Sequence, residues 1–224
     1  MEKAVVIFSG GQDSTTCLGW ALDKFDEVVT ISFKYGQKHE VELQQAKKIA
    51  KELNAEHHTI DVSFFGELVD SALTHDGDVN KMHPRLKDLP ASYVPNRNAL
   101  FLTLSHAFAQ KIGADNLVTG VCQTDYSGYP DCRQSFVDAM AIALKEGSEV
   151  PIQIHTPLMY LNKAETFELA ENVGVLDEVL KLSHTCYNGD DTMNEWGRGC
   201  GECPACKLRK QGYEEYREMK NESN

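Results

Sequence analysis

The chain has 224 residues, 42% of them hydrophobic, and carries 34 acidic against 22 basic side chains for a formal net charge of −12. This acidic excess argues against a nonspecific nucleic-acid binder, whose affinity rests mainly on lysine and arginine neutralising phosphates. No apolar run reaches the length of a membrane span, and the apolar run before Ser9 is short, so we expect no signal peptide and a cytoplasmic location.

The first motif is a short apolar strand that runs directly into a glycine turn. Residues 4–8 (AVVIF) have the composition of a buried strand, and residues 9–14 read SGGQDS. We expect a helix over residues 15–23, with N-cap chemistry from the hydroxyls of residues 14–16. Adjacent glycines let the backbone turn sharply and present N–H groups beside the positive end of a helix. The arrangement predicts an anion site, although it lacks the lysine of the GxxxxGK[ST] phosphate loop.

Strand-like and helix-like segments then alternate, which is typical of a parallel sheet covered by helices, so the expected fold class is α/β. We expect further strands at residues 27–33, 57–62, 116–121 and 152–158, and helices at residues 38–53, 64–73, 97–112, 133–145 and 162–173. Residues 74–95 carry three prolines and little periodicity, which favours a lid or binding loop. Residues 123–131 form a second, polar loop, and the charged tail at 213–224 is expected to fray.

Two basic residues stand at predicted helix starts, near the strand ends at which α/β proteins bind ligands. Lys163 follows the last predicted strand, and Arg97 begins the helix at 97–112. We interpret both as charges for a phosphate group. The alternatives are an exposed lysine and an arginine that caps its helix.

Four of the seven cysteines form a C-x13-C-x2-C-x2-C pattern near the end of the chain. They are Cys186, Cys200, Cys203 and Cys206. Four thiolates at this spacing satisfy one tetrahedral zinc ion, which would be structural because no coordination position is left open. An iron–sulfur cluster is the alternative, but the ferredoxin pattern continues with a fourth cysteine and a proline that are absent here.

The other three cysteines carry less information. Cys17 lies on the first predicted helix and is interpreted as buried packing. Cys122 and Cys132 flank the polar loop, where a nucleophilic or sulfur-carrying role stays open. Without a secretory signal, all seven are expected to be reduced thiols.

Three further stretches give a resemblance to a known family: residues 94–98 (VPNRN), 120–133 (GVCQTDYSGYPDCR) and 185–189 (TCYNG). Together with SGGQDS and the four cysteines, they resemble the 7-cyano-7-deazaguanine synthases of queuosine and 7-deazapurine biosynthesis, members of the PP-loop ATP pyrophosphatase superfamily. The likeness runs from Ala4 to about Tyr216. Asn96 replaces a family glycine, which asparagine can do because it tolerates left-handed backbone. Residues 190–196 are an apparent insertion, which a loop absorbs at little entropic cost.

The resemblance implies a fold and a domain organisation. The fold would be a Rossmann-like parallel sheet of the adenine nucleotide alpha hydrolase type, with a C-terminal zinc-binding helical segment. Residues 1–180 would form the PP-loop domain, residues 181–216 the segment that binds one structural Zn²⁺ per chain, and residues 217–224 a tail.

The resemblance also implies an activity and its residues: ATP and ammonia would convert 7-carboxy-7-deazaguanine to 7-cyano-7-deazaguanine through an acyl adenylate and an amide. Asp13 would hold the Mg²⁺ that accompanies ATP, and Lys163 and Arg97 would be the other catalytic residues. The nucleotide would contact Phe8, Ser9, Gly10, Gly11, Gln12, Asp13, Ser14, Thr15, Thr16, Cys17 and Leu18. The deazaguanine would contact Asp125, Tyr126, Ser127, Gly128, Tyr129 and Asp131.

Other functions stay open from the residues alone. A PP-loop tRNA-modifying sulfurtransferase would need a basic face and an exposed cysteine pair, and the acidic charge speaks against it. Another adenylating amidoligase, of the NAD or GMP synthetase kind, is a second alternative, and a non-enzymatic zinc-ribbon module is a third. We expect no direct nucleic-acid or membrane partner. A homodimer is kept as one assembly, because the sequence does not determine the oligomeric state.

Overall fold

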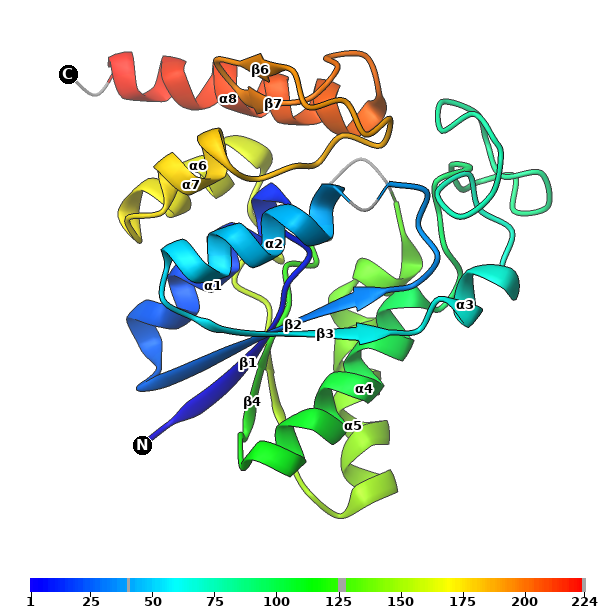
Figure 1. Ribbon diagram of the computed structural model, residues 1–224, viewed down its shortest axis with the longest axis vertical. Coiled ribbons are helices and arrows are strands. Elements are labelled where there is room, and N and C mark those ends of the chain that lie inside the picture. The colour runs from blue at the N-terminus through cyan, green and yellow to red at the C-terminus, as the bar shows by residue number, and fades with distance from the viewer. Residues whose placement is uncertain (40, 125–127, 223–224) are drawn as a thin grey trace.

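The computed structural model describes residues 1–39, 41–124 and 128–222, and its centre is a five-stranded parallel sheet of order β3-β2-β1-β4-β5 (Figure 1). The strands are β1 (Lys3–Ile7), β2 (Glu27–Lys34), β3 (Glu56–Asp61), β4 (Asn116–Val118) and β5 (Gln153–His155). The order reverses at β1, which pairs with β2 on one side and β4 on the other. Such a reversal opens a crevice at the carboxyl ends of the two strands. The predicted α/β class with a parallel sheet is confirmed.

Helices cover both faces of the sheet (Figure 1). They are α1 (Gln12–Lys24), α2 (Val41–Glu52), α3 (Phe64–Glu67), α4 (Arg97–Ile112), α5 (Gln134–Ser148), α6 (Lys163–Asn172), α7 (Leu176–Lys181) and α8 (Pro204–Glu222). The two faces follow from the strand period of two. On β1, Val6 packs with residues of α1 and α2, whereas its neighbour Val5 packs with residues of α4.

The first helix starts earlier than predicted. Helix α1 begins at Gln12 with Gly11 as its N-cap, and no side chain caps it. The hydroxyls of Ser14 and Thr15 donate instead to the Gly11 carbonyl, at 3.2 and 2.8 Å. The expected capping role of residues 14–16 is therefore wrong, because these hydroxyls bond back inside the first turn.

The other boundaries differ in understandable ways. Helix α4 has the predicted bounds, whereas α3 ends six residues before the predicted end at residue 73. The chain leaves the helix because its backbone finds partners elsewhere: the Ala72 N–H donates to the Ala91 carbonyl at 2.8 Å. Strands β4 and β5 cover only three residues each. Within residues 74–95 the structure has turns and one isolated bridge, Met82 to Pro90, in agreement with the predicted loop.

The C-terminal region is more ordered than expected. Helix α8 continues to Glu222, and Tyr216 is buried against Phe167 of α6 with ring centroids 5.9 Å apart. Lys220 adds an ion pair to Glu171 at 2.6 Å. The expected fraying from residue 213 is therefore wrong through residue 222, because one face of the helix packs on α6. Residues 223 and 224 lie outside the described residues.

No helix within the described residues is both long and apolar enough to cross a membrane.

Candidate functional site

The SGGQDS loop joins the carboxyl end of β1 to the N-terminus of α1. Gly10 has a φ of +81°, and a Cβ there would lie 2.6 Å from both the Ala46 amide nitrogen and the Glu42 carbonyl oxygen of α2. Only glycine fits this approach. Gly11 is the N-cap residue of α1 and has no side chain that could accept a hydrogen bond from the first helical N–H groups. The positive end of α1 faces the crevice. The local structure is that of an anion site.

The loop side chains are tied to one another. The Ser9 amide donates to Ser14 Oγ at 3.2 Å, and the two hydroxyl oxygens lie 3.1 Å apart. The backbone of His184 also holds the loop, because its N–H donates to the Gly10 carbonyl at 3.0 Å. The loop is therefore held in place before any ligand binds.

The loop borders a cavity of about 270 Å³ at the carboxyl ends of β1, β2 and β4. One end holds the loop and its polar neighbours: Ser9, Gln12, Asp13, Ser14, Lys163, Thr185 and Arg209. The other end is rich in aromatic side chains and contains Phe33, Tyr35, Arg97, Phe101, Tyr129 and Tyr187. We call these the loop end and the aromatic end. The division suits a ligand with a charged tail and a planar ring.

Asp13 and Lys163 meet at the loop end. The Lys163 Nζ donates to both carboxylate oxygens of Asp13, at 2.9 and 3.0 Å. A capping box between Asn162 and Glu165 fixes the helix start from which Lys163 projects. The side chain of Lys163 is 9% exposed and that of Asp13 is 29% exposed, so a ligand in the cavity can reach the carboxylate. The structure thus brings together two residues predicted from distant parts of the sequence.

Arg97 lies at the aromatic end instead. Its guanidinium carbon is 5.8 Å from the centre of the Tyr35 ring. Burial lowers the pKa of Arg97, but Tyr35 and Asp131 outweigh it and raise that pKa overall. Asn96 precedes it with a φ of 60°, as expected for an asparagine that replaces glycine. Nearby, burial raises the pKa of Glu42 to about 7, and Arg97 partly opposes this shift.

The predicted substrate loop is only partly described. Asp125, Tyr126 and Ser127 lie outside the described residues, and Gly128 adopts a φ of +62°. Tyr129 lines the cavity, and its hydroxyl lies 2.8 Å from Ser92 Oγ.

Asp131 has a different position from the one expected. It is 5% exposed, is not among the residues that line the cavity, and accepts the Asn98 N–H of α4 at 3.2 Å. It therefore holds the start of the helix that carries Arg97. Burial raises the pKa of Asp131, and Arg97 opposes the rise.

The expected nucleotide contacts separate into three groups. Phe8, Ser9 and residues 12–14 line the cavity, Gly10 and Gly11 are not among its lining residues, and residues 15–18 are buried within α1. Thr15 and Thr16 donate their hydroxyls to helix carbonyls, and Cys17 is fully buried, as predicted. Burial is the largest cause that raises the Cys17 pKa, followed by Asp13.

Several cavity residues were not predicted from the sequence. Tyr35, Gln37 and Glu42 follow β2, and no motif marks them. Thr185 and Tyr187 lie within the TCYNG stretch that carried the resemblance. The sequence therefore marked this stretch, but it did not predict that these two residues line the cavity. Arg209 also lines the cavity, and nothing in its sequence neighbourhood indicates this.

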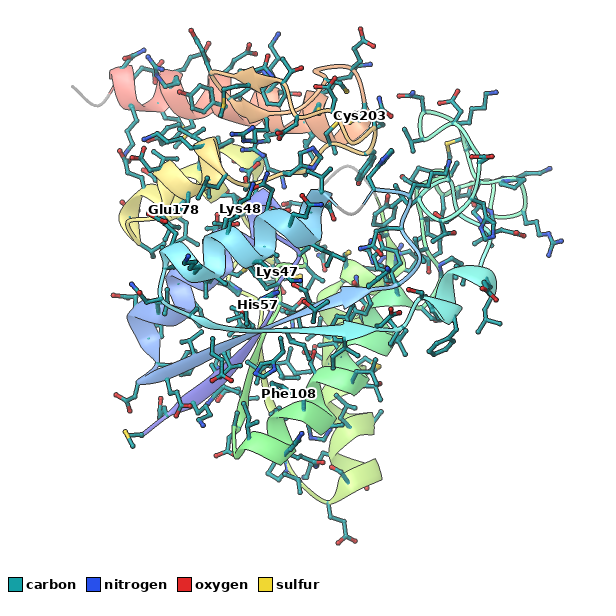
Figure 2. All side chains as sticks on the ribbon, viewed as in Figure 1. Lys47, Lys48, His57, Phe108, Glu178 and Cys203 are labelled. Carbon is teal, nitrogen blue, oxygen red and sulfur yellow. The ribbon has the colours of Figure 1, made fainter. Side chains whose placement is uncertain are left out.

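The four clustered cysteines come together as predicted. Their sulfur atoms all lie within 4.8 Å of one another, and those of Cys200 and Cys206 are 3.9 Å apart. Tetrahedral zinc with bonds of about 2.3 Å places its sulfur ligands about 3.8 Å apart, so the donor set fits such an ion. Cys203 lies directly before α8 (Figure 2). All seven cysteines are outside disulfides.

The apparent insertion at residues 190–196 contributes one strand and the turn of a small hairpin beside this cluster. The hairpin consists of β6 (Met193–Asn194) and β7 (Gly197–Arg198). Between them, Trp196 is 7% exposed and packs in the same buried cluster as Cys186 and Cys206. The inserted tryptophan therefore shields the cysteine cluster from water.

This fold and site define an α/β protein with an anion-binding loop at the carboxyl edge of a parallel sheet. Solved structures of similar fold include a 4-thiouridine synthetase–RNA complex with bound ATP (TM-score 0.53, 14% identity, 97% of this chain and 51% of that one). Another is the NMN synthetase of Francisella tularensis (TM-score 0.51, 17% identity, 96% and 84% coverage). At these identities the likeness shows the fold alone.

The family follows from closer matches. The family model of the queuosine biosynthesis protein QueC matches residues 3–217. The 7-cyano-7-deazaguanine synthase of Wolinella succinogenes is 52% identical over 96% of this chain and 94% of its own length, and that of Bacillus subtilis is 50% identical over 99% and 98%. The chain belongs to the QueC family, and the resemblance seen in the sequence is confirmed.

Proposed function

We propose that this chain is a 7-cyano-7-deazaguanine synthase, an ATP-dependent ligase that uses 7-carboxy-7-deazaguanine and ammonia. The observation that carries the chemical proposal is the Asp13–Lys163 pair, 2.9 Å apart beside the uncapped N-terminus of α1. The family match favours this function over a sulfurtransferase or another amidoligase.

The substrate carboxylate is a poor electrophile, so the reaction must first attach a leaving group to it. Attack of the substrate carboxylate on the α-phosphorus of ATP gives an acyl adenylate and pyrophosphate. Ammonia adds to the acyl carbon and expels AMP, which leaves the amide. The amide oxygen attacks a second ATP in the same way, and loss of AMP and a proton gives the nitrile.

The loop end supports both activation steps, because each builds negative charge between the α- and β-phosphates. The backbone N–H groups of residues 9–14 and the positive end of α1 would stabilise this charge. The N–H groups of Ser9, Gly11 and Gln12 donate to side-chain hydroxyls in the structure, so a bound phosphate would replace or share these acceptors. The Lys163 ammonium adds a positive charge that helix α6 holds in place. Asp13 would hold Mg²⁺, a hard cation that prefers carboxylate and phosphate oxygens and would supply further charge neutralisation.

The aromatic end suits the planar deazaguanine. Tyr129 lines the cavity from the polar loop, and Tyr35 and Phe101 line it as well. Arg97 lies among these rings, so we assign it to the substrate carboxylate that becomes activated.

We further propose that the cysteine cluster binds one structural zinc ion. Its support is the compact set of four sulfur atoms that the Trp196 hairpin covers. The ion would join the C-terminal segment to the α/β domain and take no part in the reaction.

The decisive experiment incubates the protein with 7-carboxy-7-deazaguanine, ATP, Mg²⁺ and ammonium and follows the products by mass spectrometry. We expect the nitrile, with two AMP and two pyrophosphate released for each one formed. A second reaction supplies synthetic 7-amido-7-deazaguanine and ATP without ammonium, and it should give the nitrile with AMP. ADP and phosphate as products, or an amide that is never converted, would contradict the scheme.

A further inference from the structure

Arg209 is a buried cation whose bonds go to neutral acceptors. It projects from α8 and is 1% exposed. Its Nε donates to the Trp196 carbonyl at 2.9 Å and its Nη2 to the Val179 carbonyl at 2.6 Å. Among the residues that the structure describes, no acidic side chain forms an ion pair with it. Burial is the largest cause that lowers its pKa, to about 10, so the group stays protonated at neutral pH.

Asp13 and Cys206 partly oppose the lowering of the Arg209 pKa. A buried charge without a direct ion-pair partner is still costly, so its position needs an explanation. Gly197, which has a φ of +111°, lies directly beside the guanidinium. A Cβ at this glycine would overlap the Arg209 guanidinium. The hairpin backbone thus fits closely around the guanidinium, and the site is built for it.

The guanidinium also reaches the loop end of the cavity, which it lines together with Asp13. Its Nη1 donates to Thr185 Oγ1 at 3.2 Å, and the same oxygen accepts the Gln12 N–H at 3.3 Å. Gln12 is the first residue of α1. One hydroxyl therefore connects the guanidinium to the helix terminus that receives the anion.

We propose that Arg209 is a positioning residue of the pyrophosphate loop, and that the bound pyrophosphate group adds negative charge near a guanidinium that has no ion-pair partner among the described residues. The inference rests on the proposed function, in which ATP releases pyrophosphate at this loop. Arg209 acts through Thr185 on the first turn of α1 and through its charge on the anion.

The test measures the affinity for inorganic pyrophosphate with Mg²⁺ by calorimetry in Arg209→Met, Arg209→Lys and Gly197→Ala. Loss of one charged hydrogen-bond partner corresponds to a weakening of about 10- to 100-fold, which we expect for Arg209→Met. Arg209→Lys should lose less, because it keeps the charge without the fork of donors. Gly197→Ala keeps the arginine but displaces it, so it should also weaken pyrophosphate binding.

Arg198→Met is the matched control, because Arg198 lies on the same hairpin and pairs with Asp191 at 3.0 Å, away from the cavity lining. It should leave pyrophosphate affinity unchanged. Metal content and melting temperature report folding for every variant, and the KM for ATP should rise more than kcat falls in Arg209→Lys.

Wild-type pyrophosphate affinity in a folded Arg209→Met or Gly197→Ala protein would overturn the inference. If Arg209→Met does not fold, unchanged affinity in both Arg209→Lys and Gly197→Ala would also overturn it. Failure of the proposed function looks different: the wild-type protein would then bind pyrophosphate with the Arg209 dependence described but form no nitrile.

Discussion

Asp13 and Lys163 are separated by 150 positions in the chain and share two hydrogen bonds in the cavity. Asp13→Asn should keep the fold, because the side chain is partly exposed and packs little. It should lower kcat by about 10²- to 10³-fold, the usual cost of removing one electrostatic contribution to a transition state. Steady-state nitrile formation at several Mg²⁺ concentrations measures the effect.

Asp177→Asn provides the control for this variant. Asp177 also pairs with a lysine, Lys181, at 2.7 Å, but both side chains are exposed on α7. An exposed pair of this kind contributes about 0.5 kcal/mol or less, and its loss should not change kcat. Equal rates for Asp13→Asn and the wild-type protein, with the same Mg²⁺ dependence, would remove Asp13 from the mechanism.

At the residue scale, two predicted site residues that stand in or beside a motif, Asp13 and Lys163, line the cavity. Asp13 lies in the loop, and Lys163 follows a strand end, which is where α/β proteins place ligand contacts. Arg209 could not be found in this way, because its guanidinium bonds to Val179 of α7, to Thr185 and to Trp196 in the β6–β7 turn, which only the tertiary structure brings together. Asp131 is among the expected deazaguanine contacts because it belongs to the polar loop, yet in the structure it is buried and accepts the Asn98 N–H of α4.

At the scale of elements, the β2–β3 edge contains a histidine whose titration is linked to folding. His57 pairs with Thr30 in the sheet, and its Nδ1 lies 2.8 Å from the Thr30 hydroxyl oxygen. Burial lowers its pKa from 6.5 to about 4, and Lys47 of α2 adds to the shift. Figure 2 shows both residues on this side of the molecule.

The pH dependence follows from this lowered pKa. The unfolded chain gains a proton on His57 below pH 6.5, and the folded protein gains it only near pH 4, so stability falls across this interval. Because the ring is only half buried, we expect a loss of about 1–2 kcal/mol from this group. His57→Asn should flatten the decline in chemical denaturation series from pH 7 to pH 4. The exposed His75→Asn should reproduce the wild-type slope, and an unchanged slope in His57→Asn would contradict the linkage.

The contact between α6 and α8 is another feature with a testable consequence. A Cβ on Gly212 would lie 2.5 Å from the Lys163 Cβ and 3.0 Å from its carbonyl carbon. Gly212→Ala should therefore push the two helices apart, lower the melting temperature and reduce kcat, because Lys163 begins α6.

Gly147→Ala is the opposite case. Gly147 lies within α5, and a Cβ added there would have no neighbour within 4 Å in the described part of the chain. Alanine should therefore stabilise the protein by up to about 1 kcal/mol. Thermal denaturation and activity of the two variants together test the assignment. A Gly212→Ala protein as stable and active as the wild type would mean that α8 does not determine the position of Lys163.

Element types in the α/β domain were predictable because apolar periodicity and turn residues agree there. The helix at 97–112 has the predicted bounds, since an X-Pro-Asn turn precedes it and Gly113 ends it in left-handed backbone. The resemblance implied a helical C-terminal segment, and α8 agrees with it. Its extension to Glu222 was not predicted, because the polar sequence hides a narrow buried face that includes Arg209, Gly212 and Tyr216. This face is buried because it packs on α6, and the local sequence pattern of α8 carries no information about that contact.

At the scale of the whole molecule, the cysteine cluster joins the C-terminal segment to the rest of the chain. Cys203→Ser should reduce bound zinc from about one ion per chain and lower the melting temperature, because structural zinc contributes much of the folding free energy around its ligands. Metal analysis and thermal denaturation measure both effects. Full zinc retention, or the visible absorbance of iron and sulfide, would contradict the zinc assignment.

The charge distribution has a kinetic consequence. The protein carries a formal net charge of −12, yet basic residues outnumber acidic ones in its cavity lining: Arg97, Lys163 and Arg209 against Asp13 and Glu42. An approaching nucleotide polyanion is therefore repelled at long range and attracted only after it enters. Added salt shortens the Debye length to about 8 Å at physiological ionic strength, which screens the outer repulsion more than the interactions inside the cavity. ATP should consequently associate faster as salt rises toward that level, the reverse of the behaviour of an enzyme with a positively charged surface.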